Sequence, residues 1–272
     1  MPDTPTVRRS ELHVRDISLE TYEAGQGAPL LFLHGMAGAA ASREVIALLG
    51  ETHHVIAPSH PGYGASIRPI GFDSIDDLAY VYLDVIQAVA TVEGPVTVVG
   101  CSIGAWVAAE AAVRSQASVS ALVLSTPLGI KVGGVLDRDI VDLYAHSPET
   151  IREALYHNPD FGVIDFSAMA DEELEQHFKN VESTAMYGWK PYMHNPKLLG
   201  RVGRITVPTL IVRGQSDTFL SESLPLAYRD AIPGAALSTV ELAGHEPERE
   251  QPTQFTRVVS EFLSNVPAPQ NV

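Results

Sequence analysis

The chain has 272 residues, 45% of them hydrophobic and 19% charged, so it is long and apolar enough to fold around its own core without disulfides or metals. Its 18 Lys and Arg stand against 33 Asp and Glu, and the formal net charge of −15 makes nucleic acid and anionic membrane surfaces poor partners. Cys101 is the single cysteine, which excludes an intramolecular disulfide. We find no targeting or membrane-spanning segment and expect a cytoplasmic protein.

The predicted elements begin with a hairpin, followed by buried strands that alternate with helices. Apolar and polar residues alternate across residues 12–19 and indicate a half-buried antiparallel hairpin. Ser74 and Asp77 match a capping box that opens a helix reaching Val89, and an alanine-rich helix is expected over Gly104–Arg114. Short apolar runs predict strands at residues 29–33, 55–57, 96–99, 121–124, 209–212 and 237–242.

This alternation predicts an α/β fold, with a mostly parallel central sheet and helices on both of its faces. A final helix with an apolar face begins at Pro252. Residues 129–196 contain no clear strand and indicate a helical insertion. The helices expected there cover Leu136–Ala145, Pro148–Tyr156 and Asp171–Ala185. We therefore expect a core of residues 1–128 and 197–272 and a helical cap of residues 129–196.

The segment Gly100-Cys101-Ser102-Ile103-Gly104 matches G-x-S-x-G between a predicted strand and a predicted helix. A sharp turn here strains the backbone of the central residue and lifts Ser102 Oγ into the open at the head of the helix, where the helix dipole favours negative charge. Side chains in place of the flanking glycines would collide with the neighbouring strand and helix. Ser102 is therefore the predicted nucleophile, and Cys101 is expected to point into the core.

A serine nucleophile needs a base, and the base needs a carboxylate that orients it. His245 follows the last predicted strand, and Asp217 follows the strand at residues 209–212. Because parallel strands end at one edge of their sheet, both side chains should reach Ser102. The end of the preceding core strand, Ser125-Thr126-Pro127, holds no carboxylate, which favours Asp217. The predicted catalytic residues are Ser102, Asp217 and His245.

The loop after the first buried strand is the candidate oxyanion loop. Acyl transfer develops negative charge on a carbonyl oxygen, and preorganised N–H groups stabilise that charge. The loop begins His34-Gly35-Met36 and continues with small residues, so we assign the N–H groups of Met36 and Ile103 as the donors. His34 is then expected to fix the loop rather than to act as a second base.

Together these features resemble the α/β-hydrolase fold superfamily. The resemblance covers about residues 28–128 and 197–265, and it rests on His34-Gly35, the turn Pro61-Gly62-Tyr63-Gly64-Ala65-Ser66, the serine elbow, Asp217 and Gly244-His245. It implies that the insertion is a lid over the active site. Epoxide hydrolases and haloalkane dehalogenases of this superfamily carry Asp at the elbow, where this chain carries Ser102. Hydrolases of meta-cleavage products often have a longer glycine-rich loop after His-Gly, where this chain has Met36-Ala37-Gly38-Ala39-Ala40-Ala41.

The aromatic residues of the predicted lid leave two interpretations open. Tyr187, Trp189, Tyr192 and Met193 either line an apolar substrate pocket, to which His34 would contribute, or form a small core of the lid itself. The histidines at 146, 157, 177 and 194 lack the spacing of metal ligands. We therefore expect no metal and no other cofactor.

The expected activity is hydrolysis of a carboxylic ester or lactone through an acyl-enzyme. The alternative is carbon–carbon bond hydrolysis of a ring-cleavage dienoate or a 1,3-diketone-like substrate with the same three residues. Some proteins that resemble this family are small-molecule receptors, which is a second alternative. The expected partner is a small-molecule substrate, and the chain is expected to be a monomer or a homodimer.

Overall fold

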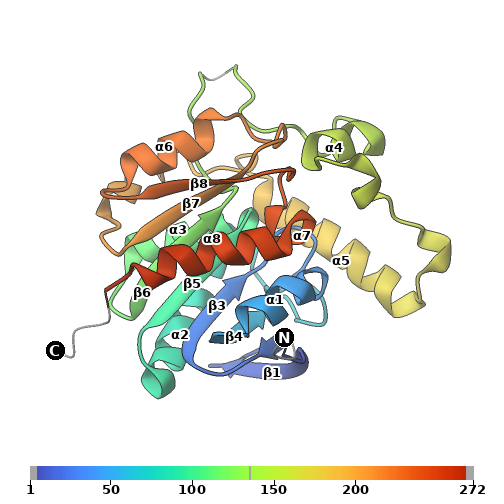
Figure 1. Cartoon of the computed structure of the whole chain (residues 1–272). Coiled ribbons are helices and arrows are strands. Elements are labelled where there is room, and N and C mark those ends of the chain that lie inside the picture. Colours follow the sequence, from blue (N-terminus) through green and yellow to red (C-terminus); the bar gives the residue numbers. More distant parts are fainter. Residues whose placement is uncertain (1–4, 135, 268–272) are drawn as a thin grey trace.

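The computed structural model describes residues 5–134 and 136–267. Its sheet has eight strands in the order β1-β2-β4-β3-β5-β6-β7-β8 (Figure 1). β1 and β2 pair antiparallel, β2 pairs antiparallel with β4, and the later neighbours are parallel. The strands are β1 Arg8–Val14, β2 Ile17–Ala24, β3 Ala28–Leu33, β4 His53–Pro58, β5 Val96–Cys101, β6 Val119–Ser125, β7 Thr209–Gly214 and β8 Ala236–Val240. The predicted fold class and the opening hairpin are confirmed.

Helices cover both faces of this sheet. Buried residues of α2, α3 and α6 pack on one face, and those of α1 and α8 pack on the other. The α-helices are α1 Arg43–Leu49, α2 Ile75–Glu93, α3 Ile103–Arg114, α4 Pro148–Leu155, α5 Asp171–Gly188, α6 Ser223–Ala231, α7 Pro247–Glu250 and α8 Pro252–Ser264. Four short 3₁₀ turns are η1 Ala39–Ser42, η2 Pro159–Gly162, η3 Phe166–Ala168 and η4 Val202–Arg204. The predicted capping box at Ser74 is present at the start of α2.

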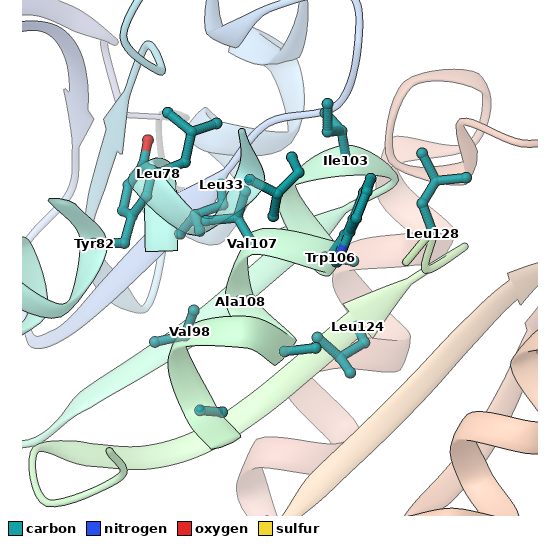
Figure 2. Packing of buried hydrophobic residues seen from close by; sticks show 14 of the residues in the cluster. Leu33, Leu78, Tyr82, Val98, Ile103, Trp106, Val107, Ala108, Leu124 and Leu128 are labelled. Carbon is teal, nitrogen blue, oxygen red and sulfur yellow. The ribbon is translucent and has the colours of Figure 1, made fainter. Parts of the chain in front are cut away.

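Alternate side chains of the central strands point to opposite faces of the sheet. In β3, Leu31 and Leu33 pack toward α2 and α3, whereas Leu30 and Phe32 pack toward α1 and α8. Figure 2 shows the first of these layers, where Trp106 and other side chains of α3 lie among residues of α2, β5 and β6. Because such a strand is buried on both faces, its sequence is an apolar run without polar alternation.

The segment between β6 and β7 contains α4 and α5, which extend beyond the end of the sheet (Figure 1). The helix predicted over Leu136–Ala145 is wrong, because this stretch is irregular. Asp139 accepts hydrogen bonds from the N–H groups of Val132 and Gly133, and Asp137 accepts one from Gly134. Side-chain carboxylates that bond nearby backbone in this way compete with helix formation.

The ends of several other elements also differ from the prediction by one to four residues. The last strand ends at Val240 rather than Leu242, because Leu242 has a left-handed backbone with φ 53° and is exposed. The helix expected to end at Ala185 continues to Gly188. No helix within residues 5–134 and 136–267 is long and apolar enough to cross a membrane.

Candidate active site

The predicted serine elbow is a tight turn between β5 and α3. Ser102 has φ 53° and ψ −114°, a conformation that costs a residue with a side chain of order 1–3 kcal/mol. The turn is tight because both flanking glycines touch backbone. A Cβ on Gly104 would lie 2.2 Å from the carbonyl oxygen of Leu33, and one on Gly100 would lie 2.6 Å from the carbonyl oxygen of Gly104. The glycines therefore let α3 approach β3 closely and hold the serine at the strand end. The expectation that Ser102 stands in the open is wrong, because the residue is only 1% exposed.

The structure brings the three predicted catalytic residues together. Ser102 Oγ lies 2.8 Å from His245 Nε2, and His245 Nδ1 lies 3.0 Å from Asp217 Oδ2. The other oxygen of Asp217 accepts hydrogen bonds from the N–H groups of Phe219 and Leu220, so the carboxylate is held in place. With Nδ1–H donating to Asp217, Nε2 is free to accept the serine proton.

His245 is completely buried, and its loop is fixed on both sides. Its N–H donates to the carbonyl oxygen of Leu155 at the end of α4, and its own carbonyl oxygen accepts from Thr126 Oγ1. Burial acts to lower the pKa of His245, but the Asp217 carboxylate, helped by Glu246 and Glu248, raises it above its ordinary value. The imidazolium that forms when the base takes a proton is therefore stabilised.

The loop after β3 is held by a pair of buried histidines. The His60 N–H donates to His34 Nε2 at 2.9 Å, and His60 Nε2 donates to the His34 carbonyl oxygen at 3.1 Å. His34 Nδ1 in turn donates to the carbonyl oxygen of Gly35 at 2.7 Å. Both ring nitrogens of His34 are thus used, and burial lowers its pKa to about 4. His34 is a neutral group that braces the loop carrying Met36.

The second predicted donor is at the start of α3. Ile103 is the first residue of this helix, so its N–H has no partner within the helix. Met36 is half-buried, on the loop that follows β3. The assignment of these two N–H groups as an oxyanion hole stays a prediction.

Comparison with known proteins identifies the family. The sequence pattern of the alpha/beta hydrolase family matches residues 30–258. The chain belongs to this family. It is 27% identical to a 2-hydroxy-6-oxononadienedioate/2-hydroxy-6-oxononatrienedioate hydrolase of Cupriavidus pinatubonensis, and the match covers 89% of each chain. It is 26% identical to a putative carbamate hydrolase, RutD, of Azorhizobium caulinodans, over 93% of this chain and 98% of the relative.

Solved structures show the same fold. A serine hydrolase involved in carbazole degradation, the CarC enzyme, superimposes with a TM-score of 0.75 at 22% identity, covering 95% of this chain and 99% of that one. The protein is accordingly a hydrolase of the alpha/beta hydrolase family. Within its described residues, no group of three or more His, Cys, Asp or Glu is placed to hold a metal ion.

The aromatic residues of the hydrolase's inserted segment lie in different surroundings. Tyr187 is buried and donates to the carbonyl oxygen of Pro61, and Met193 is buried against Gly188. The hydroxyl of Tyr192 donates to the carbonyl oxygen of Val141. Trp189 is 59% exposed and packs edge-on against Tyr144. Their assignment as pocket residues stays a prediction, and their contacts are with the inserted segment and the turn at Pro61.

Helix α5 of the hydrolase is tied to the loops beside the elbow. Asn180 donates to the carbonyl oxygen of Ala37 and accepts from the N–H of Gly64. Ser183 Oγ donates to the carbonyl oxygen of Gly62 at 2.7 Å. The inserted segment therefore contacts both the loop after β3 and the Pro61–Ser66 turn, and it contacts the His245 loop through Leu155.

Sequence reasoning missed the charged residues that follow His245. The buried Glu246 forms an ion pair with the partly exposed Arg249, and it accepts a hydrogen bond from the Tyr156 hydroxyl at 2.9 Å. Glu248 is also buried. The run Glu246-Pro247-Glu248-Arg249-Glu250 directly after the base was visible in the sequence, but it did not indicate which of its four charged side chains are buried. His60, which braces His34, carried no separate signal.

Proposed function

We propose that the protein hydrolyses a carbon–carbon bond beside a ketone in a ring-cleavage dienoate or a similar 1,3-diketone-like substrate. The observation that carries the chemistry is the line of contacts from Ser102 through His245 to Asp217, at 2.8 Å and 3.0 Å. The substrate class is supported by relatives named as hydrolases of such dienoates, among them the Cupriavidus pinatubonensis enzyme that this chain matches over 89% of its length.

In the proposed reaction Ser102 Oγ bonds to the ketone carbon while its proton passes to His245. The oxyanion accepts hydrogen bonds from the N–H groups of Met36 and Ile103. The dienoate reacts as its keto tautomer, in which the enol proton has moved to the carbon beside the ketone. The carbon–carbon bond between that carbon and the former ketone carbon then breaks, because its electron pair is delocalised into the conjugated keto acid, and the resulting enolate takes the proton from His245. Water, deprotonated by His245, cleaves the acyl-enzyme and releases a carboxylic acid. Asp217 stabilises the charged form of His245 in both stages.

Hydrolysis of an ester or lactone is the second candidate. It is favoured by the loop after His34, which has a run of alanines where hydrolases of meta-cleavage products often have a glycine-rich loop. The same three residues suffice, because an alcohol replaces the carbon leaving group. The two candidates therefore differ in the leaving group and in the shape of the pocket, and a substrate test separates them.

The test offers purified protein a meta-cleavage dienoate, an aryl ester and a lactone, and identifies the products by mass spectrometry. The expected result is cleavage of the dienoate into two acids, with a loss of about 10⁴-fold or more in Ser102→Ala. Turnover of esters or lactones alone would favour the second candidate. Full turnover by Ser102→Ala would contradict both.

Cys101→Ala provides a matched control beside the nucleophile. Cys101 is completely buried, and burial, with nearby Glu248 and Glu246, raises the pKa of its thiol well above the ordinary value. A fluorophosphonate probe should therefore add once to the parent and once to Cys101→Ala, but not to Ser102→Ala. An adduct that disappears in Cys101→Ala and persists in Ser102→Ala would assign the nucleophile to the cysteine.

A further inference from the structure

A buried carboxyl lies where the oxyanion loop and the serine elbow meet. Helix α7, which carries Glu248, begins two residues after His245 and packs against η1 and α1. Glu248 is only 2% exposed, so its side chain points inward. A methyl group placed on Gly35 would lie 3.8 Å from Glu248 Oε1 and 3.4 Å from Ser102 Cβ. Glu248 therefore borders the loop that precedes Met36 and the residue that carries the nucleophile.

The surroundings of this carboxyl favour its neutral form. Within the described part of the chain, Glu248 Oε2 has no hydrogen-bond partner. Burial and the neighbouring Glu246 carboxylate raise the pKa of Glu248 to about 8, although its own backbone N–H, Arg249 and His245 act in the opposite direction. Arg249 is already paired with Glu246, so it is not free to neutralise a second carboxylate.

The other elements around Glu248 do not supply a counter-charge. From β5, the neighbouring titratable group is the Cys101 thiol, which stays protonated because burial and Glu248 raise its pKa. At the start of α1, Arg43 and Glu44 are both exposed, and Arg43 lies over the ring of Tyr22. On α8, which also packs against α7, the charged residues Arg257 and Glu261 are exposed and pair with each other. An ionised Glu248 would thus hold a largely uncompensated charge in the interior.

We propose that Glu248 is a positioning residue whose neutral carboxyl keeps the oxyanion loop and the elbow competent, and whose ionisation opposes acyl transfer. The proposal rests on the proposed serine chemistry. A negative charge beside Gly35 and Ser102 repels the oxyanion that forms on the substrate, where the stabilising groups are uncharged N–H donors. The same charge also stabilises the imidazolium of His245, but Glu248 contributes least among the groups that raise the pKa of His245, and Asp217 already balances the imidazolium at 3.0 Å.

The test measures how fast a fluorophosphonate probe labels Ser102 between pH 6 and pH 10, by intact mass. In the parent, one ionisation near pH 8 should leave about a tenth of the maximal labelling rate at pH 9. Glu248→Gln keeps the shape and the neutral form, so its rate should change less than about twofold from pH 8 to pH 9. Glu44→Gln, an exposed acid on the adjoining α1, should follow the parent.

The shape of the pH profile decides the result, so a lower overall rate in a variant does not affect it. An alkaline fall that persists unchanged in Glu248→Gln would overturn the role of Glu248. If Glu248→Gln does not fold, Glu248→Met is neutral and of similar size, and it should show the same flat profile. A folded parent that is not labelled at any pH would instead overturn the proposed serine chemistry and this role with it. Circular dichroism at each pH confirms that the compared proteins are folded.

Discussion

Replacing Ser102 by glycine should leave the protein more stable than replacing it by alanine, although both changes remove the nucleophile. Ser102 has φ 53° and ψ −114°, which glycine adopts without the steric cost that a Cβ imposes. Relief of that cost is worth about 1–3 kcal/mol, while the greater freedom of glycine in the unfolded chain costs about 0.4–1 kcal/mol. The net expectation is that Ser102→Gly is about 1–2 kcal/mol more stable than Ser102→Ala.

The comparison with Ser102→Ala isolates the backbone, because both variants lose the hydrogen bond to His245. Urea unfolding at fixed pH gives the free energies, and the Tm difference should be about 2 °C or more for a chain of this size. Ala88→Gly is the control, at an exposed position inside α2 with ordinary helical backbone. The free energy of unfolding of Ala88→Gly should be about 0.5–1 kcal/mol lower than that of the parent. A Ser102→Gly variant no more stable than Ser102→Ala would refute the argument that the elbow is strained.

Three further predictions follow from the site. Asp217→Asn should lower kcat about 10⁴-fold and move the acid limb of kcat/KM to lower pH than in the parent, since Asp217 raises the pKa of His245. An unmoved limb in the pH–rate profile would show that Asp217 does not act on the base. As pH rises from about 4.5 to about 8, the free energy of unfolding of Glu248→Gln should rise relative to that of the parent, by up to about 4 kcal/mol. The reason is that the parent's carboxyl binds its proton more tightly in the folded than in the unfolded state, and this contribution to stability is lost as the carboxyl ionises. A constant difference between the two proteins in urea titrations across this range would contradict the prediction. Gly104→Ala should lower the free energy of unfolding by about 2 kcal/mol or more, because the new methyl group would lie 2.2 Å from the carbonyl oxygen of Leu33. A decrease of less than about 0.5 kcal/mol in urea unfolding would mean that α3 can shift at no cost.

The local sequence was enough to predict the elements that carry the serine and its partners. The elbow glycines, the buried strands and the positions of Asp217 and His245 after strand ends each depend on a few neighbouring residues. Since parallel strands all present their carboxyl ends at one edge, three such loops could be expected to meet. The structure places Ser102 Oγ, His245 and Asp217 within hydrogen-bond distance, in agreement with that expectation.

The substrate class was not readable in the same way. The sequence favoured an ester or lactone, whereas the names of several relatives support carbon–carbon bond hydrolysis. Substrate choice depends on the side chains that surround a bound substrate, and Tyr187 and Tyr192, which were predicted to be among them, illustrate the difficulty. Their clustering suggested a pocket or a lid core, but the hydroxyl of Tyr187 bonds the carbonyl oxygen of Pro61, outside the inserted segment, and that of Tyr192 bonds Val141, in an irregular stretch of the segment itself.

Sequence alone determined this protein's sheet, its serine elbow and the order of the predicted catalytic residues, because these follow from local periodicity and from turns that only glycine permits. The tertiary structure decided where loop side chains point. His34 and His60, 26 residues apart in the sequence, are joined by hydrogen bonds. Asp139 binds nearby backbone N–H groups in a stretch that was predicted to be helical. The side chain of Glu248 points into the interior beside Gly35. A loop residue has no repeating pattern to reveal its buried side, so its direction is set by the groups that distant segments bring to it.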